Sequence, residues 1–158
     1  MNMRQINDVF DEKFTENIFA AKIINYLKRK RYSVFIEIPN MGQSVDLVAQ
    51  RSRWLTFVEV KLHNWNRAIS QCKNHEIVAD YIYIAIATKN VSDRFFEISK
   101  KKGYGILHYD LKRKKVSVVL EAKYNKSVWG PQRKILFEKY RKIKKNGHST
   151  LDVVRNIC

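Results

Sequence analysis

Two short apolar segments that carry charged residues constrain this chain more than any other feature. Ser44–Ala49 contains Asp46, and Phe57–Leu62 contains Glu59 and Lys61. Both segments have the composition of buried strands, where an ionised group is costly unless it is paired or bound to a metal. Side chains alternate along a strand, so Glu59 and Lys61 point to the same side, and Asp46 on a neighbouring strand can face that side too. Two carboxylates and an ammonium that converge in this way suit a divalent metal ion and a phosphodiester.

The length and composition predict one globular domain. A chain of 158 residues, 45% hydrophobic and 12% aromatic, is long enough for one core, and its five Gly and two Pro leave little room for linkers. We assign residues 1–128 to this domain and residues 129–158 to a basic helical extension packed on it. The N-terminus has no apolar signal segment, and no apolar run reaches membrane-spanning length. We therefore expect an intracellular, cytoplasmic protein with no membrane partner.

The positive charge is large and unevenly distributed. The net charge is +16, and residues 100–145 hold 16 Lys and Arg against three acids. This imbalance favours a polyanionic partner, most simply nucleic acid, although a solvated surface would have the same composition. Contacts from such side chains to phosphates carry no base information. The residues expected to make them are Lys100, Lys101, Lys102, Lys112, Arg113, Lys114, Lys115, Arg133, Lys134, Arg141 and Lys142.

The apolar periodicity predicts a mixed α/β sheet with helices on both faces. Three strands with tight connections predict an antiparallel meander, and the uniformly apolar segment 81–87 predicts a central strand covered on both faces. The predicted helices cover about Phe10–Lys30, Trp65–Ala79, Asp93–Lys102, Gln132–Lys145 and, as a short last helix, Ser149–Ile157. The predicted strands cover Tyr32–Ile38, Val45–Gln50, Trp54–Leu62, Tyr81–Ala87, Gly105–Tyr109 and Val116–Leu120.

Glu16 has two interpretations. It projects onto the apolar face that Phe19, Ala20 and Ile23 form on the first predicted helix, where a carboxylate needs a reason. The first interpretation is functional: Glu16 points towards the same site as the charged strands. The second is that an acid in a first turn interacts favourably with the helix dipole at an end that reaches solvent. The sequence leaves both open.

The charged strands and the helix before them resemble the PD-(D/E)xK nuclease superfamily. Asp46 lies on one strand, Glu59-x-Lys61 follows on the next strand 13 residues later, and the preceding helix carries Glu16. In detail the arrangement is similar to the small archaeal Holliday-junction resolvases and to restriction-endonuclease-like proteins. The order α-β-β-β-α-β, over about residues 10–87, agrees with the core of that superfamily. The sequence departs from the motif in having no Pro before the Asp.

A second helix extends this resemblance. Gln71, in the predicted helix after the lysine strand, resembles the glutamine of a helix found often in the superfamily at this place. Gln71 would position a water molecule or a backbone phosphate, and Glu16 would complete the shell around a metal ion. The resemblance therefore implies a restriction-endonuclease-like core, extended by a basic C-terminal β-hairpin and helix.

The chemistry expected of the charged strands is metal-assisted hydrolysis. Cleaving a phosphodiester requires neutralising a charged transition state and generating hydroxide near neutral pH, and Mg²⁺, or Mn²⁺, held by carboxylates does both. Asp46 and Glu59 are the expected ligands, and the resemblance implies the main-chain carbonyl of Val60 as a third. Lys61 is expected to orient or deprotonate the attacking water, or to stabilise charge on the phosphate.

Other chemistry-bearing residues have weaker patterns. Glu37 lies on an adjacent strand and can join the site, but an exposed acid on an edge strand explains it equally well. His63 follows the lysine strand and can contact phosphate, but the sequence favours a surface histidine. The four His and two Cys lack the spacing of zinc ligands, and Cys72 is expected to be a small buried hydrophobe. The Trp and Tyr residues, Trp54 and Trp129 among them, can stack on exposed bases but are also ordinary packing residues.

The sequence favours a metal-dependent DNA endonuclease that selects branched or damaged DNA and acts as a homodimer. Two symmetric sites would allow a dimer to cut two strands. A restriction or defence nuclease is an alternative, as is a nucleic-acid-binding module that keeps the nuclease fold without catalysis. A basic ribosomal or chromatin-type binder explains the charge but not the carboxylates within strands. DNA and RNA are not distinguished.

Overall fold

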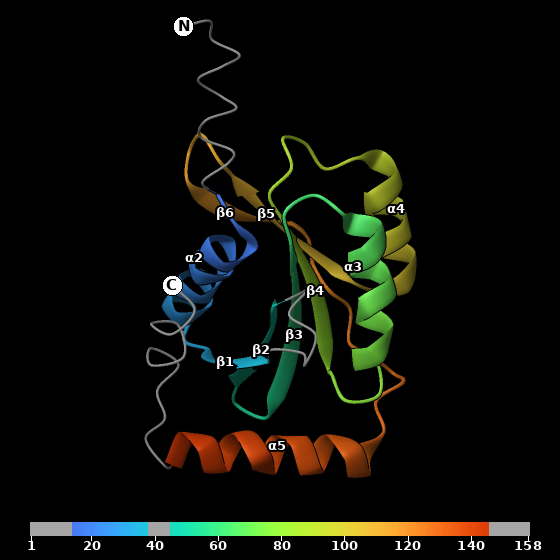
Figure 1. The fold of residues 1–158 in the computed structure, drawn as a ribbon. Helices are drawn as coiled ribbons and strands as arrows, with labels where there is room; N and C mark the ends of the chain where they lie inside the picture. Colours follow the sequence, from blue (N-terminus) through green and yellow to red (C-terminus); the bar gives the residue numbers. More distant parts are fainter. Residues whose placement is uncertain (1–13, 38–44, 146–158) are drawn as a thin grey trace, which may run out of the picture.

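The computed structural model describes residues 14–37 and 45–145, with the backbone alone for Glu37, Val45, Asp46 and Lys145. A six-stranded sheet has α2 on one face and α3 and α4 on the other, and α5 runs across one end (Figure 1). The helices are α2 (Glu16–Arg29), α3 (Trp65–Cys72), the 3₁₀ turn η1 (Lys73–His75), α4 (Asp93–Lys102) and α5 (Gly130–Lys145). The strands are β1 (Ser33–Glu37), β2 (Val45–Arg51), β3 (Trp54–Lys61), β4 (Tyr81–Ile86), β5 (Gly105–Asp110) and β6 (Lys115–Leu120).

The strands lie in the sheet in the same order as in the chain. Strands β1, β2 and β3 form an antiparallel meander, β3, β4 and β5 run parallel, and β6 returns antiparallel to β5. The predicted mixed sheet, the meander and the central position of β4 are therefore confirmed. The parallel run places the C-terminal ends of β3, β4 and β5 together at one end of the sheet.

A hydrophobic core lies on each face of the sheet. On the first face, Phe19 and Ile23 of α2 pack with Val58 and Val60 of β3, and all four side chains are buried. On the second face, α3 and α4 bury Phe57 and Ile84 in a core that also contains Cys72, as expected. Burying apolar area on both faces removes most of the sheet from water, which is the main source of stability. No helix in the described part of the chain has both the length and the apolarity to cross a bilayer.

The first helix begins later than predicted. Phe14 and Thr15 are not helical, and α2 starts at Glu16, so the prediction of a helix from about Phe10 is wrong at these two positions. Thr15 explains the start, because its side-chain oxygen accepts a hydrogen bond from the Ile18 N–H at 3.2 Å and caps the helix. Residues 10–13 lie outside the described residues, as does the predicted helix 149–157.

The helix predicted over Trp65–Ala79 is also shorter. It ends at Cys72, and the chain tightens into η1 before it reaches β4. The Asn125 side-chain amide donates hydrogen bonds to the main-chain carbonyls of Glu76 (2.5 Å) and Ala79 (2.9 Å). Since these carbonyls are held from a distant segment, local periodicity alone does not reveal where the helix stops.

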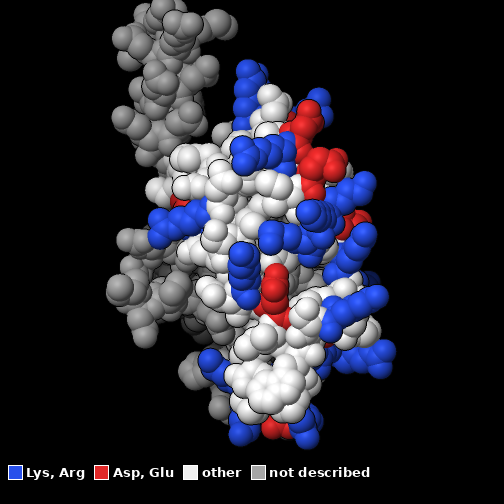
Figure 2. Space-filling view, turned by 90° about the vertical axis from the view of Figure 1, so that its right-hand side faces the viewer, with Lys and Arg blue, Asp and Glu red and all other residues white. Residues whose placement is uncertain are grey.

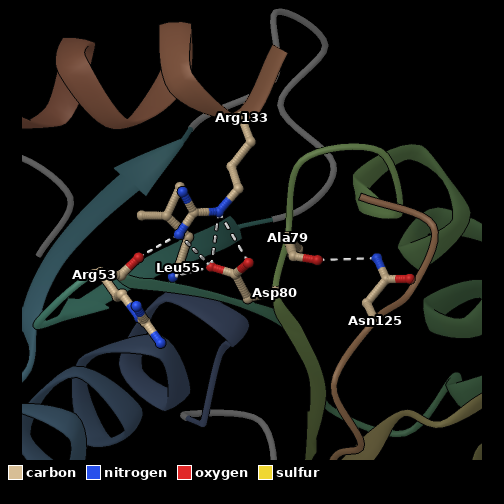
Figure 3. A network of polar contacts seen from close by, with 6 residues as sticks. All are labelled: Arg53, Leu55, Ala79, Asp80, Asn125 and Arg133. Carbon is tan, nitrogen blue, oxygen red and sulfur yellow. Dashed lines mark hydrogen bonds and ion pairs between the residues drawn. The ribbon is translucent and has the colours of Figure 1, made fainter. Parts of the chain in front are cut away.

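An ion pair between Asp80 and Arg133 fastens α5 to the sheet (Figure 3). The Asp80 carboxylate is 1% exposed and accepts hydrogen bonds from Arg133 Nε (2.9 and 3.0 Å), from Arg133 Nη2 (2.8 Å) and from the Leu55 N–H (2.8 Å). The guanidinium also donates to the Arg53 carbonyl. These bonds to Asp80 raise the pKa of Arg133. The Arg133 guanidinium, which the sequence predicted to contact phosphate, thus has a structural partner in a buried carboxylate.

Candidate functional site

Two charged side chains of β3 are nearly removed from water. Glu59 is 1% exposed and Lys61 is 3% exposed, although both belong to residue types that are rarely buried. They share one face because they are two residues apart, and Phe57 on that face belongs to the core beneath α3 and α4. The predicted clustering of Glu59 and Lys61 on one side of a strand therefore holds in the structure.

The strand register brings the first predicted carboxylate to the same place. Asp46 of β2 lies directly opposite Glu59, and Glu37 of β1 lies directly opposite Asp46. Residues directly opposite each other in an antiparallel pair lie on the same face, a few ångströms apart. Positions 37, 46 and 59 thus form one row across three strands. The side chains of Glu37 and Asp46 lie outside those that the structure describes.

Glu16 contacts Lys61 from the helix that packs on the other face of the sheet. Its Oε2 lies 3.9 Å from Lys61 Nζ, with the Glu16 side chain 32% exposed and the Lys61 side chain 4% exposed. The contact is possible because Lys61 is the last residue of β3 and Glu16 is the first residue of α2. Glu16 is also the acid of a capped first turn, so it fits both interpretations that the sequence allowed. The structure adds a partner, Lys61, to the functional interpretation.

His75 is a member of the site that sequence reasoning missed. Its Nε2 lies 3.9 Å from Glu59 Oε2, and its ring stacks on Phe57 with centroids 4.5 Å apart. Gln71, whose Oε1 is buried, lies four residues before His75 along α3 and η1. Residues four apart face the same side of a helix. This spacing from Gln71 is a sequence signal that could have pointed to His75, although the contact with Glu59 itself exists only in the folded structure.

Asp46, Glu59 and the main-chain carbonyl of Val60 are oxygen donors of the kind that suits a hard divalent cation. Among the described side chains, which do not include that of Asp46, no three His, Cys, Asp or Glu residues form a cluster. The Val60 side chain is buried on the opposite face, and its backbone lies between β2 and β4, opposite Val45 and Ala85. Carboxylate and carbonyl oxygens are the ligands that Mg²⁺ and Mn²⁺ prefer.

The basic residues predicted to contact phosphates lie at two ends of the sheet. The turn that carries Lys112, Arg113 and Lys114 follows β5, at the end where β3 finishes with Lys61. A hydrogen bond from the Arg113 N–H (3.0 Å) helps to hold this turn and lowers the pKa of Asp110, as does one from the Lys112 N–H (2.9 Å). Lys115 begins β6 beside the turn, and all four cations are exposed.

The other predicted cations belong to α4 and α5. Lys100, Lys101 and Lys102 end α4 immediately before β5 begins, and Lys134, Arg141 and Lys142 lie on α5; all six are exposed. Figure 2 shows the side of the molecule that bears α3 and α4, where Lys and Arg are spread among Asp and Glu rather than gathered into one patch. The described residues therefore form several separate basic areas rather than one (Figure 2).

The remaining candidates have simple environments. His63 is exposed at the end of β3. Trp65 stacks on Phe95 with ring centroids 5.3 Å apart, which is a packing contact. Trp129 is 58% exposed, immediately before α5.

Comparisons with known proteins bear on the fold alone. A solved structure, the SPO1766 protein of unknown function from Silicibacter pomeroyi, is similar, with a TM-score of 0.61 and 16% sequence identity. The match covers 85% of this chain and 89% of that chain. No family model matches the sequence, and no curated protein matches it. The similarity supports an α/β fold with a mixed sheet flanked by helices over most of the chain.

Proposed function

We propose that this chain is a metal-dependent endonuclease with a restriction-endonuclease-like core, and that it hydrolyses phosphodiester bonds in DNA. One observation carries the proposal: Glu59 and Lys61 are 1% and 3% exposed on one face of β3, with position 46 directly opposite Glu59. Burying a carboxylate and an ammonium is costly, and hydrophobic residues would stabilise the fold at least as well. A catalytic role explains why the charges are there.

The metal would be held by Asp46 and Glu59, with the Val60 carbonyl as a further oxygen ligand. The fit rests on the donor chemistry, since the buried Glu59 carboxylate, a second carboxylate directly opposite it in the register and the neighbouring Val60 carbonyl are hard oxygen donors suited to Mg²⁺ or Mn²⁺. When bound, such an ion supplies charge neutralisation on the phosphate and lowers the pKa of a coordinated water.

The protein side chains have roles of their own. Lys61 would donate hydrogen bonds to a non-bridging phosphate oxygen or to the attacking water, and its low exposure strengthens such electrostatic contacts. Glu16, 3.9 Å from Lys61 Nζ, would hold that ammonium in place or add an oxygen to the metal shell. Gln71 would position water or a backbone phosphate, and the neighbouring His75 would orient the Glu59 carboxylate.

The preferred substrate is branched or damaged DNA, cut by a homodimer. The separated basic areas at both ends of the sheet support this preference. A molecule that touches phosphates at several places responds to the shape of DNA rather than to base sequence. A restriction or defence nuclease, and a binding module without catalysis, are the outcomes against which this proposal is tested.

The test is cleavage of supercoiled plasmid and of a synthetic four-way junction with Mg²⁺, Mn²⁺ or EDTA. The variants are Asp46→Asn, Glu59→Gln and Lys61→Met, with Glu97→Gln as the matched control because Glu97 is an exposed acid on α4. We expect cutting that requires metal, prefers the junction, and is lost in the three site variants but not in the control. Equal cutting by a folded Glu59→Gln variant would remove the site from the mechanism. DNA binding without cutting would favour the module, and preferential cutting of linear duplex would favour the restriction-type enzyme.

A further inference from the structure

Three aromatic rings gather at the end of the sheet where β3 and β4 begin. Trp54 opens β3, Tyr81 opens β4, and Tyr124 follows β6. The three ring centroids are 5.8 to 6.0 Å apart in edge-to-face arrangements. Tyr124 is 49% exposed, and Trp54 and Tyr81 are half-buried. The cluster therefore presents ring surface to solvent instead of closing over a core.

Two arginines at this end of the sheet hold their guanidinium groups against aromatic rings, one of them against Trp54 of the cluster. Arg53 lies over the Trp54 ring at 4.6 Å from the centroid, and Arg51 lies over the Tyr32 ring at the same distance. Both are exposed, and they flank Ser52, which turns the chain between β2 and β3 with a φ of 56°. The backbone thus presents two cations side by side next to the rings.

The charges around these rings favour an anionic partner. Lys123 and Lys126 are exposed on either side of Tyr124 in the chain. The nearby acids have partners: Glu121 accepts a hydrogen bond from the Tyr83 hydroxyl at 2.7 Å, and Asp80 is buried against Arg133. Arg51 Nη1 donates a hydrogen bond to the Lys30 carbonyl at 3.4 Å. An arginine stacked on an aromatic ring keeps its other outward N–H groups available for phosphate.

This surface is separate from the proposed catalytic site. Trp54 and Lys61 lie at opposite ends of β3, about 23 Å apart at the rise of a strand, and they point to opposite faces of the sheet. Nucleic acid bound here would not occupy the row that contains Glu59.

We propose that the surface formed by Tyr32, Arg51, Arg53, Trp54, Tyr81 and Tyr124, called here the aromatic–arginine surface, binds single-stranded DNA. Unpaired bases stack on the exposed rings, while Arg51 and Arg53 bind the phosphates between them. Rings favour a single strand because bases in a duplex are already stacked on one another, and each stacked base contributes without sequence preference. The proposal deepens the DNA-binding part of the proposed function, and it does not depend on the catalytic residues.

The test measures binding by fluorescence anisotropy in EDTA, where no metal-dependent cutting takes place. The probe is a fluorescein-labelled oligothymidylate, compared with an abasic strand of equal length and with duplex DNA. We expect the parent protein to prefer the oligothymidylate to both. Tyr124→Ala should weaken its binding about tenfold and leave binding of the abasic strand unchanged, whereas Tyr124→Phe should bind like the parent.

A charge-matched pair of variants tests the arginines. Arg51→Gln with Arg53→Gln removes two positive charges at the surface, and Lys22→Gln with Arg94→Gln removes two exposed charges from α2 and α4. The first pair should reduce affinity and lower the slope of log affinity against log salt by about 1.4, more than the second pair. Equal losses in both pairs, or a folded Tyr124→Ala variant that binds the oligothymidylate like the parent, would overturn the proposal. Because binding is measured without metal, an inactive catalytic site would leave this result standing.

Discussion

Glu16 and Lys61 connect the two faces of the sheet. Glu16 belongs to α2, which packs on one face, and the alternation of side chains along β3 assigns Lys61 to the other face. Their side chains meet at 3.9 Å at the end of β3. Lys61 is almost completely buried, so its ammonium has lost most of its water. A nearby carboxylate compensates for part of that loss.

Replacing Glu16 with Gln is expected to lower the cleavage rate about 10- to 100-fold, as loss of a group that supports an active-site side chain commonly does. Thr15→Ala is the control, because it weakens the same end of α2 by removing the cap, at a cost of about 1 kcal/mol, and keeps the carboxylate. The measurement is junction cleavage under single-turnover conditions beside urea denaturation. An equal loss of rate in both variants would assign the effect to the helix end rather than to the carboxylate.

Arg133→Ala is expected to destabilise the protein by about 2–3 kcal/mol, because the nearly inaccessible Asp80 carboxylate loses the cation that accompanies it. Arg133→Lys should restore only part of this, since an ammonium cannot reproduce the fork of Nε and Nη2 bonds. Urea denaturation of Arg133→Ala, Asp80→Asn and the double variant measures the coupling. Strict additivity of the two single changes would contradict the pairing.

Gly105→Ala is expected to destabilise by about 1–3 kcal/mol through overpacking. A Cβ at this position would lie 2.2 Å from Cε1 of the Tyr83 ring and 2.8 Å from the Ala122 backbone nitrogen. Gly130→Ala is the matched control, since no atom lies within 4 Å of a Cβ there. Thermal unfolding of the two variants should therefore give a clearly lower midpoint for Gly105→Ala alone, and similar midpoints would contradict this packing.

Stability is expected to fall in alkaline solution because of two tyrosines. Burial raises the pKa of Tyr83 and Tyr104, and hydrogen bonds to Glu121 and Glu76 raise it further. A raised pKa means that the folded state holds the proton more tightly than the unfolded state, whose tyrosines titrate near pH 10. The contribution is complete below pH 10 and is lost as the pH rises towards the folded-state values.

Urea denaturation between neutral pH and pH 11 measures this loss, with absorbance at 295 nm reporting tyrosinate. The double variant Tyr83→Phe/Tyr104→Phe should lose less stability over the same range than the parent. Identical pH dependence in the two proteins would assign the alkaline loss to other groups.

Local signals were sufficient for most elements of the fold. Helix α4 has the predicted bounds because Ser92 caps it, accepting from the Phe95 N–H at 3.2 Å, and Gly103 ends it with a φ of 77°. Both signals come from the residues directly before and after the helix. The same holds for β4, where six apolar residues in succession indicate a strand buried within the sheet.

Long-range partners account for what local reasoning missed. Arg133 belongs to a residue type that is usually exposed. Only its contact with Asp80, 53 positions earlier in the chain, reveals its structural role. Asn125 also acts from far along the chain, because its side chain binds the main-chain carbonyls of Ala79 and Glu76, 46 and 49 positions earlier, in the segment after α3. His75 depended on a tertiary contact with Glu59. Such pairings arise from the packed fold and leave no trace in a window of adjacent residues.

The order of the strands has a consequence for how the chain folds. Each strand pairs with its neighbours in sequence, so no strand has to insert between two that have already formed. Short closures have a small entropic cost, and contacts close in sequence favour rapid folding. On a ribosome the sheet can therefore grow strand by strand from β1 as the chain emerges. Asp80 would remain without its guanidinium partner until α5 is made. Synthesis of this last described helix is therefore the step that allows the buried ion pair between Asp80 and Arg133 to form.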